Sequence, residues 1–299
     1  NDGEDSTTLL KNADIAMYRA KEMGKNTYQF YSADMSSRAF ERLTLESNLR
    51  RALEHSEFRL YYQPQIDVTT GAIVGVEALL RWQHPEFGLV MPNDFIPLLE
   101  ETGLIVPTGE WVLDTACAQL AAWHAQGWPR LRLAVNLSPR QFQTPNLTTV
   151  VKQALDRLEG DPGRVELEIT EGMLLRHAPI TAETLEALHS LGVRMAIDDF
   201  GTGYSSLSYL RRLPIDTLKI DRMFVRDIPH DPDDSAITVA IIALVQSMKL
   251  EMIAEGVENT AQRDFLQARG CNLMQGFLFS RPLPVEEITR LLQSGKKFG

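Results

Sequence analysis

Short apolar runs alternate with segments of helical periodicity over most of this chain. From residue 58 onward there are eight runs rich in Val, Ile and Leu, at residues 58–66, 73–82, 131–137, 164–170, 193–198, 215–220, 250–254 and 271–275. From the third run onward, helix candidates occur near 147–159, 179–191, 203–212, 233–248, 259–269 and 284–293. Strands that alternate with helices are typical of repeated βα units, which build a parallel sheet covered by helices.

Eight strands of this kind predict an α/β fold of the TIM-like (β/α)8 barrel type. The span from residue 58 to residue 293 is close to the ~250 residues usual for such a barrel. Only residues 67–72 join the first two runs, and this connection is too short for a crossover helix. The first two strands should therefore form an antiparallel hairpin, which gives a barrel with an antiparallel first strand. A doubly wound open sheet is the alternative fold.

The first 57 residues follow a different pattern. Apolar positions predict one helix that ends near Gly24, a short strand-like segment at 27–31 and a second amphipathic helix over 37–55. One helix and one strand cannot form a core. We therefore expect residues 1–36 to be the remnant of a preceding domain, residues 37–57 to be a linker helix and residues 58–299 to be the barrel. The first residue is Asn and no signal-like segment follows it, so we expect the chain to be part of a longer protein.

Composition and charge restrict the partners of this chain. Thirty Lys and Arg against forty Asp and Glu give a net charge of −10, and consecutive basic residues occur only in pairs. This argues against binding to duplex nucleic acid, which requires basic surfaces. No apolar stretch reaches the ~20 residues that span a bilayer, and the two cysteines match neither a disulfide framework nor a zinc spacing. We expect a cytoplasmic fragment without membrane contact, although missing upstream segments could anchor the parent protein.

Polar side chains occur inside the predicted strands or where these strands end. They are Glu77, Asn136, Glu166, Glu168, Glu171, Asp198, Asp199, Lys219, Glu255 and Gln275. Each one alone is more simply explained as a loop entrance or a helix cap. Carboxylates that converge at one mouth of a barrel, however, repel one another unless cations lie among them. None of the six histidines ends a strand run, so the donors are oxygens and predict Mg²⁺ or Mn²⁺ rather than zinc or copper.

Adjacent Asp198 and Asp199 can face one site only if the chain turns there, and the Phe200–Gly203 segment favours a turn. Two such carboxylates can bind a pair of metal ions of the kind that catalyses phosphodiester hydrolysis. Gly201 and Gly203 also suggest a dinucleotide-binding loop, but Ser206 occupies the third glycine position. Lys219 either neutralises the carboxylates or contacts the nucleophile, and charge balance alone does not distinguish these roles.

Over residues 40–293 the chain resembles the EAL domain family of cyclic diguanylate (c-di-GMP) phosphodiesterases. The matching segments are Gln63-Pro64, Glu77-Ala78-Leu79, Asn136-Leu137-Ser138, Glu168–Glu171, Asp198–Leu207, Leu218–Asp221, Glu255–Glu258 and Gln275-Gly276-Phe277. A match of three residues alone would not indicate a family. Eight segments in the order found in the family do indicate one.

The resemblance implies a barrel with an antiparallel first strand and hydrolysis of c-di-GMP to linear pGpG. It implies that Mg²⁺ or Mn²⁺, two ions per site, are held by Glu77, Asn136, Glu168 and Asp198 for one ion and by Asp199 and Glu255 for the other. Lys219 would contact the attacking water and Glu171 would anchor the Asp198–Leu207 loop, so both join Glu255 as catalytic candidates. Substrate contacts would come from Arg81, which would engage a phosphate, and from Gln63, Gln275 and Leu79.

The resemblance also implies a homodimer through the region of the Asp198–Leu207 loop. Residues 1–36 resemble the C-terminal end of a GGDEF diguanylate cyclase domain, through Ala13–Lys21 and Gly24-Lys25-Asn26. The cyclase signature itself is absent from the chain. We therefore expect no nucleotide synthesis from this fragment.

Three other functions stay open at this point. A catalytically silent receptor would bind c-di-GMP without cleaving it. An enolase-type barrel would use acidic ligands and a lysine to abstract a carbon-bound proton, although Asp199 has no role in that chemistry. A scaffold would have no activity, and it would not need a costly cluster of acidic residues.

Overall fold

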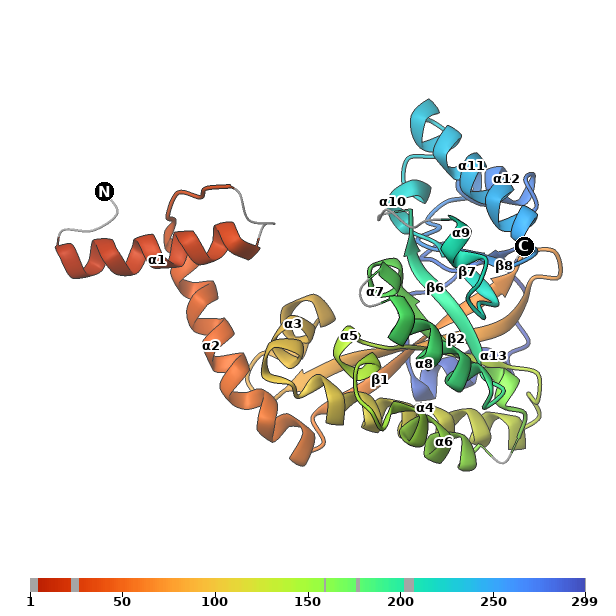
Figure 1. Ribbon diagram of the computed structural model, residues 1–299, viewed down its shortest axis with the longest axis horizontal. Helices are drawn as coiled ribbons and strands as arrows, with labels where there is room; N and C mark the ends of the chain where they lie inside the picture. The colour runs from red at the N-terminus through yellow and green to blue at the C-terminus, as the bar shows by residue number, and fades with distance from the viewer. Residues whose placement is uncertain (1–4, 23–26, 159, 176–177, 202–206, 299) are drawn as a thin grey trace. The chain divides into compact units, whose positions relative to one another are not determined.

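The structure is a computed structural model that describes residues 5–22, 27–158, 160–175, 178–201 and 207–298 (Figure 1). The chain divides into two compact units, which are described separately. The first consists of residues 1–57 and 82–104, and the second of residues 58–81 and 105–299.

Eight strands form a closed barrel. They are β1 (Phe58–Asp67), β2 (Ala72–His84), β4 (Arg132–Asn136), β5 (Val165–Thr170), β6 (Arg194–Phe200), β7 (Thr217–Ile220), β8 (Glu251–Ala254) and β9 (Leu273–Met274). Their order is β1-β9-β8-β7-β6-β5-β4-β2, and a β1–β2 pairing closes the ring. Neighbours from β2 to β9 are parallel, whereas β1 is antiparallel to β9. The prediction of a TIM-like barrel with an antiparallel first strand is confirmed, and the open sheet is wrong.

Helices pack against the outside of the barrel (Figure 1). The longer ones are α4 (Ile105–Ala125), α6 (Leu147–Asp156), α8 (Ala178–His189), α11 (Pro232–Met248), α12 (Thr260–Gln267) and α13 (Val285–Gln293). Shorter elements are α5 (Pro139–Phe142), η1 (Pro162–Arg164), α7 (Glu171–Leu175), α9 (Leu207–Leu210), α10 (Arg222–Val225) and β10 (Leu283–Pro284), which pairs with β1. Sequence analysis did not predict α4. Apolar residues occur on most sides of this helix, so its periodicity is weak.

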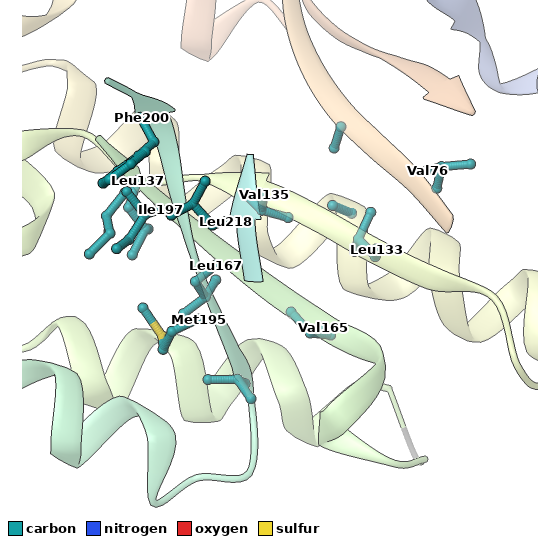
Figure 2. Close-up of a cluster of buried hydrophobic side chains, with 14 of the residues drawn as sticks. Val76, Leu133, Val135, Leu137, Val165, Leu167, Met195, Ile197, Phe200 and Leu218 are labelled. Carbon is teal, nitrogen blue, oxygen red and sulfur yellow. The ribbon is translucent and has the colours of Figure 1, made fainter. Parts of the chain in front are cut away.

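The apolar core lies between strands and helices, and Figure 2 shows part of it. On β5, Val165, Leu167 and Ile169 belong to this core. Side chains alternate between the two faces of a strand, so Glu166 and Glu168 face the barrel interior instead. On the neighbouring strands, the same alternation directs polar side chains into the barrel interior.

A charge network fills the amino-terminal end of the barrel. Arg194, the first residue of β6, donates from Nε to Oε2 of buried Glu166 at 3.2 Å and from a terminal nitrogen to Oε2 of Glu251 at 2.6 Å. Arg132 forms a further ion pair with Glu251, and the Thr217 hydroxyl donates to Glu166. Two arginines therefore balance two carboxylates, and Glu166 lies closer to the amino-terminal end of β5 than Glu168.

The first unit contains α1 (Ser6–Glu22), α2 (Ala33–Glu54), β3 (Gly88–Val90) and α3 (Pro92–Thr102). Leu49 and Ala52 on α2 and Leu99 on α3 are buried, and the two helices are in contact. Helix α2 occupies the region predicted as a helix over 37–55 but begins at Ala33. The strand-like segment predicted at 27–31 is wrong, because residues 27–32 have no regular structure and a strand needs a partner.

Within the described ranges, no helix is long and apolar enough to cross a membrane. The boundaries expected at residues 36/37 and 57/58 stay predictions.

We predict that Arg194→Met lowers the free energy of unfolding by about 3 kcal/mol, because it leaves buried Glu166 without its cation. Urea denaturation measures this loss. Arg140→Met, at an exposed position, is the matched control and should change stability by less than about 0.5 kcal/mol. Equal stability of the two variants would show that the network contributes nothing to the barrel.

Candidate active site

Lys219 lies in the barrel interior with no exposed surface. Four carboxylate oxygens surround its Nζ atom. The distances are 2.6 Å to Glu255 Oε1, 2.8 Å to Glu168 Oε2, 3.5 Å to Asp198 Oδ1 and 3.6 Å to Glu77 Oε2. These carboxylates come from β2, β5, β6 and the residue after β8. The structure therefore brings together at one lysine four residues that are far apart in the chain.

The charges in this cluster do not balance. Four ionised carboxylates around one ammonium have a net charge of −3. Burial raises the pKa of Glu168 well above its usual range, and the charges of Glu77, Asp198 and Glu255 add to this effect. Burial and the charges of Asp198 and Glu77 raise the pKa of Glu255 to about 8, although Lys219 opposes the shift. The cluster therefore favours uptake of positive charge, either as protons or as a cation.

The same carboxylates stabilise the charged form of Lys219. Burial alone would lower its pKa, but Asp198, Glu168 and the other two carboxylates raise it well above the usual value. Lys219 is therefore a stable ammonium at neutral pH. It can donate hydrogen bonds, but it cannot accept a proton.

Two amide side chains donate hydrogen bonds to Glu77, and a third amide supports one of them. Asn136 Nδ2 donates to Glu77 Oε1 at 2.7 Å, and Gln275 Nε2 donates to Glu77 Oε2 at 2.5 Å. Gln275 also donates to Gln63 Oε1 at 2.9 Å, and Gln63 in turn donates to the Ser280 carbonyl at 3.0 Å. Although burial would raise the pKa of Glu77, Lys219 and these hydrogen bonds lower it. Glu77 is therefore held in its ionised form.

The chain turns sharply after Asp198. Asp199 has φ +55° and Gly201 has φ +100°, both in the left-handed region. A Cβ atom at Gly201 would lie 2.6 Å from the Phe224 ring, so a larger residue does not fit there. The Gly201 amide donates to Glu171 Oε2 at 2.9 Å, which ties the start of the predicted Asp198–Leu207 loop to α7. Residues 202–206 of this loop lie outside the described residues.

Asp199 lies on this turn, and its amide donates to Asp198 Oδ1 at 2.9 Å. Burial raises the pKa of Asp199 to about 7, with further contributions from the charge of Asp198 and from a hydrogen bond with Asp221. Sequence analysis did not identify Asp221 as a neighbour of this site.

Arg81 and Leu79 lie on the same face of β2 as Glu77, because alternate residues share a face. Leu79 is half-buried. Arg81 is buried, its guanidinium donates to the Leu80 carbonyl at 2.8 Å, and it lies 5.6 Å from the centre of the Tyr61 ring. Sequence analysis missed Tyr61 and the Ser280 carbonyl, and a backbone carbonyl leaves no signal in a sequence.

The donor chemistry of the cluster fits a hard divalent cation. All six predicted ligands supply oxygens, and among the described residues the oxygens of buried Glu168 have no hydrogen-bond partner beyond the ion pair with Lys219. The carboxylates are, however, gathered on the Lys219 ammonium. Among the described residues, no group of three or more His, Cys, Asp or Glu side chains is arranged to hold an ion. An incoming cation would have to take over contacts that Lys219 makes now.

A cavity of about 670 Å³ lies elsewhere in the second unit. It is lined by residues of α9, of the segment between α9 and β7, of α11 and of the two residues after α11, among them Arg211 and Lys249. None of the predicted site residues lines this cavity. The carboxylate cluster is therefore the stronger candidate for the site.

Residues 46–282 match the EAL domain family. This chain belongs to the EAL domain family. It is 49% identical over 287 residues to the bifunctional diguanylate cyclase/cyclic di-GMP phosphodiesterase MucR of Pseudomonas aeruginosa, a match that covers 96% of this chain and 42% of MucR. It is 43% identical over 288 residues to the cyclic di-GMP phosphodiesterase PdeR of Escherichia coli, with 96% and 43% covered. The chain thus spans less than half the length of these curated relatives.

A solved structure of the PaMucR phosphodiesterase in a c-di-GMP complex superposes on this EAL domain with a TM-score of 0.80. The two are 49% identical, and the match covers 82% of this chain and 99% of the other. The fold of the barrel is therefore shared with a relative of known structure.

We predict that Lys219→Met lowers the free energy of unfolding by about 3 kcal/mol in the presence of a chelator, because four carboxylates lose a buried cation. Mg²⁺ or Mn²⁺ should restore part of this loss, since an ion that binds only the folded state stabilises it. Urea denaturation with and without metal measures both effects. Lys152→Met, at an exposed position on α6, should show neither, and an equal loss with and without metal would show that the cluster does not attract divalent ions.

Proposed function

We propose that this EAL domain hydrolyses one phosphodiester bond of c-di-GMP to give linear pGpG, in a reaction that depends on divalent metal ions. The observation that supports this most strongly is the buried cluster in which the carboxyl groups of Glu77, Glu168, Asp198 and Glu255 surround the single ammonium of Lys219. The names of the relatives MucR and PdeR support the choice of substrate.

In this proposal, one Mg²⁺ or Mn²⁺ ion is held by Glu77, Asn136, Glu168 and Asp198. Asp199 and Glu255 help to hold a second ion. When bound, the ions would neutralise the charge of the phosphate oxygens and lower the pKa of bound water.

The residues of the chain provide orientation and charge. Because Lys219 is protonated at neutral pH, it donates a hydrogen bond to the attacking water in this proposal and cannot take the proton of that water. Gln275 and Asn136 fix the carboxylate plane of Glu77, and Glu171 holds the turn that carries Asp198 and Asp199. A carboxylate that is already fixed loses little freedom when it binds an ion.

Substrate binding requires cationic groups, because the chain has a net charge of −10 and c-di-GMP is an anion. Arg81 supplies a planar fork for a phosphate group. Leu79, Gln63 and Gln275 complete the substrate site in this proposal. The Gln275 oxygen Oε1 is buried and accepts no hydrogen bond among the described residues, so it is available to a ligand donor.

Three further assignments belong to this proposal. Residues 1–36 are the C-terminal remnant of a GGDEF domain, and residues 37–57 link it to the barrel. The domain forms a homodimer through the region of the Asp198–Leu207 loop. It acts in the cytoplasm, where free thiols such as those of buried Cys117 and Cys271 stay reduced.

A silent c-di-GMP receptor is the second candidate. It is favoured by one observation, that the described carboxylates contact Lys219 and are not arranged around an empty ion site. A receptor would bind the dinucleotide without forming product.

Incubation of the protein with c-di-GMP and Mg²⁺ or Mn²⁺ should yield linear pGpG on chromatography, and a chelator should abolish the product. Glu77→Gln should lower the rate at least about 100-fold, because it removes a charged metal ligand. Glu287→Gln, at an exposed position on α13, is the matched control. Tight binding without product would support the receptor, and full activity of Glu77→Gln would refute the proposed ligand set.

Asp199→Asn tests the second ion. If two ions are required, we expect the turnover number to fall about 100-fold, because one carboxylate charge at the turn is lost. Asp156→Asn, exposed on α6, should retain full turnover in the same assay. A rate for Asp199→Asn equal to that of the unmodified protein would mean that one ion is sufficient.

A further inference from the structure

The cavity of about 670 Å³ in the second unit lies away from the carboxylate cluster. Its volume is within the range of about 300–1,000 Å³ that is typical of small-molecule sites. Leu213 and Ile215 come before β7 and Leu250 comes directly before β8, so the cavity lies where these two strands begin. Lys219 and Glu255 lie toward the other ends of the same strands. The cavity is therefore separate from the proposed active site.

The walls of the cavity are aliphatic. The lining residues with apolar side chains are Leu210, Leu213, Ile215, Leu244, Met248 and Leu250. Leu210 and Leu213 are buried and the other four are half-buried, so part of this apolar surface is accessible to solvent. Among the described residues that line the cavity, there is no aromatic ring to stack on a base and no carboxylate to bind a cation. The lining therefore fits an aliphatic chain.

The charged groups at the cavity are both positive. Arg211 and Lys249 line it, and both residues are exposed. Within the described part of the chain, neither of them forms an ion pair. Ser247 also lines the cavity, but its hydroxyl donates to the Leu244 carbonyl of the same helix at 2.7 Å. The two cations are therefore available to an anionic ligand.

Lys249 occupies a backbone position that glycine usually takes. It caps the carboxyl-terminal end of α11 with φ +59° and ψ +32°, in the left-handed region. The Leu250 amide donates to the Val245 carbonyl at 3.2 Å and closes the helix end. A glycine would adopt this conformation without strain. The charge that Lys249 brings to the cavity explains a lysine at this position, whereas the backbone conformation does not.

We propose that this cavity binds an anionic amphiphile with a single aliphatic chain, such as a fatty acid. The aliphatic chain lies along the apolar walls, and the carboxylate pairs with Arg211 and Lys249. Burial of the chain supplies affinity, and the two cations select the head group. A membrane surface would require apolar side chains that project into the lipid, whereas here they line a hollow. The site does not depend on the proposed hydrolysis.

The test is the binding of octanoate, decanoate and dodecanoate to the whole chain, measured by calorimetry below the concentrations at which micelles form. Affinity should rise by up to about fourfold per added CH₂ group, because the aliphatic chain is removed from water. Dodecyltrimethylammonium has a chain of the same length and a positive head group, and it should bind about 20-fold more weakly than dodecanoate. Equal affinity for octanoate and dodecanoate, or for the two head groups, would overturn the proposal.

Lys249→Gly removes the cation and the backbone strain together. It should weaken dodecanoate binding about fivefold, while the urea midpoint stays equal or rises, because glycine favours this conformation. Arg211→Met should also weaken binding about fivefold. Arg140→Met, at an exposed position on α5, is the matched control and should bind dodecanoate unchanged. Unchanged affinity in both cavity variants would show that these cations do not hold the ligand.

Two other occupants of the cavity would give different results. A membrane surface would retain the whole chain on vesicles of phosphatidylcholine and phosphatidylglycerol, without any affinity for monomeric dodecanoate. A second copy of the chain seated on the cavity would exclude dodecanoate, and Leu244→Gln would then convert a dimer to a monomer in ultracentrifugation. Either result would overturn the site for a free amphiphile.

Discussion

The surplus of negative charge in one end of the barrel is the constraint on which the proposed site depends. Ionised carboxylates that are removed from water are costly unless each has a partner. Here Lys219 is shared among Glu77, Glu168, Asp198 and Glu255, and one ammonium cannot compensate four carboxylates. Burial, together with the charges of the neighbouring carboxylates, raises the pKa values of Glu168 and Glu255. A fold maintains such an arrangement when the missing charge arrives with a ligand.

The two ends of the barrel show how the same strands produce different chemistry. On β5, Glu166 lies at the amino-terminal end, where Arg132 and Arg194 match the charges of Glu166 and Glu251. Glu168 lies two residues further along, at the end where positive charge is in deficit. The first end is balanced in charge, whereas the second favours the uptake of positive charge. The direction of the parallel strands decides which carboxylate has which role.

The segment after β9 connects this electrostatic centre with the surface. Gln275 donates a hydrogen bond to Glu77, and the Ser280 carbonyl accepts one from Gln63. In the same segment, the Arg281 guanidinium lies against the Phe277 ring. Gln63 comes from β1, which is antiparallel to the other seven strands of the barrel, so the antiparallel start of the barrel contributes a side chain to the same network. This segment therefore links the carboxylate cluster to the antiparallel first strand of the barrel.

Local patterns were sufficient to predict the strands, the hairpin and the type of site. Short apolar runs rich in Val, Ile and Leu identified the eight strands, and the six-residue connection between the first two runs predicted their antiparallel pairing, because both properties depend only on neighbouring residues. Helix α4 was missed since it is apolar on most sides, and the segment at 27–31 has strand composition without a partner strand.

The pairing of side chains was decided by the tertiary structure. The sequence by itself determined which residues bear carboxylates and that they occur in or near strand ends. Only the register between strands distant in the chain placed Glu168 at Lys219 and Glu166 at Arg194, joined Gln275 to Glu77, and brought Asp221 close to Asp199. The physical reason is that the charge balance of a buried group depends on every neighbour that the closed barrel brings within a few ångströms, and those neighbours are separated by up to about two hundred residues of chain.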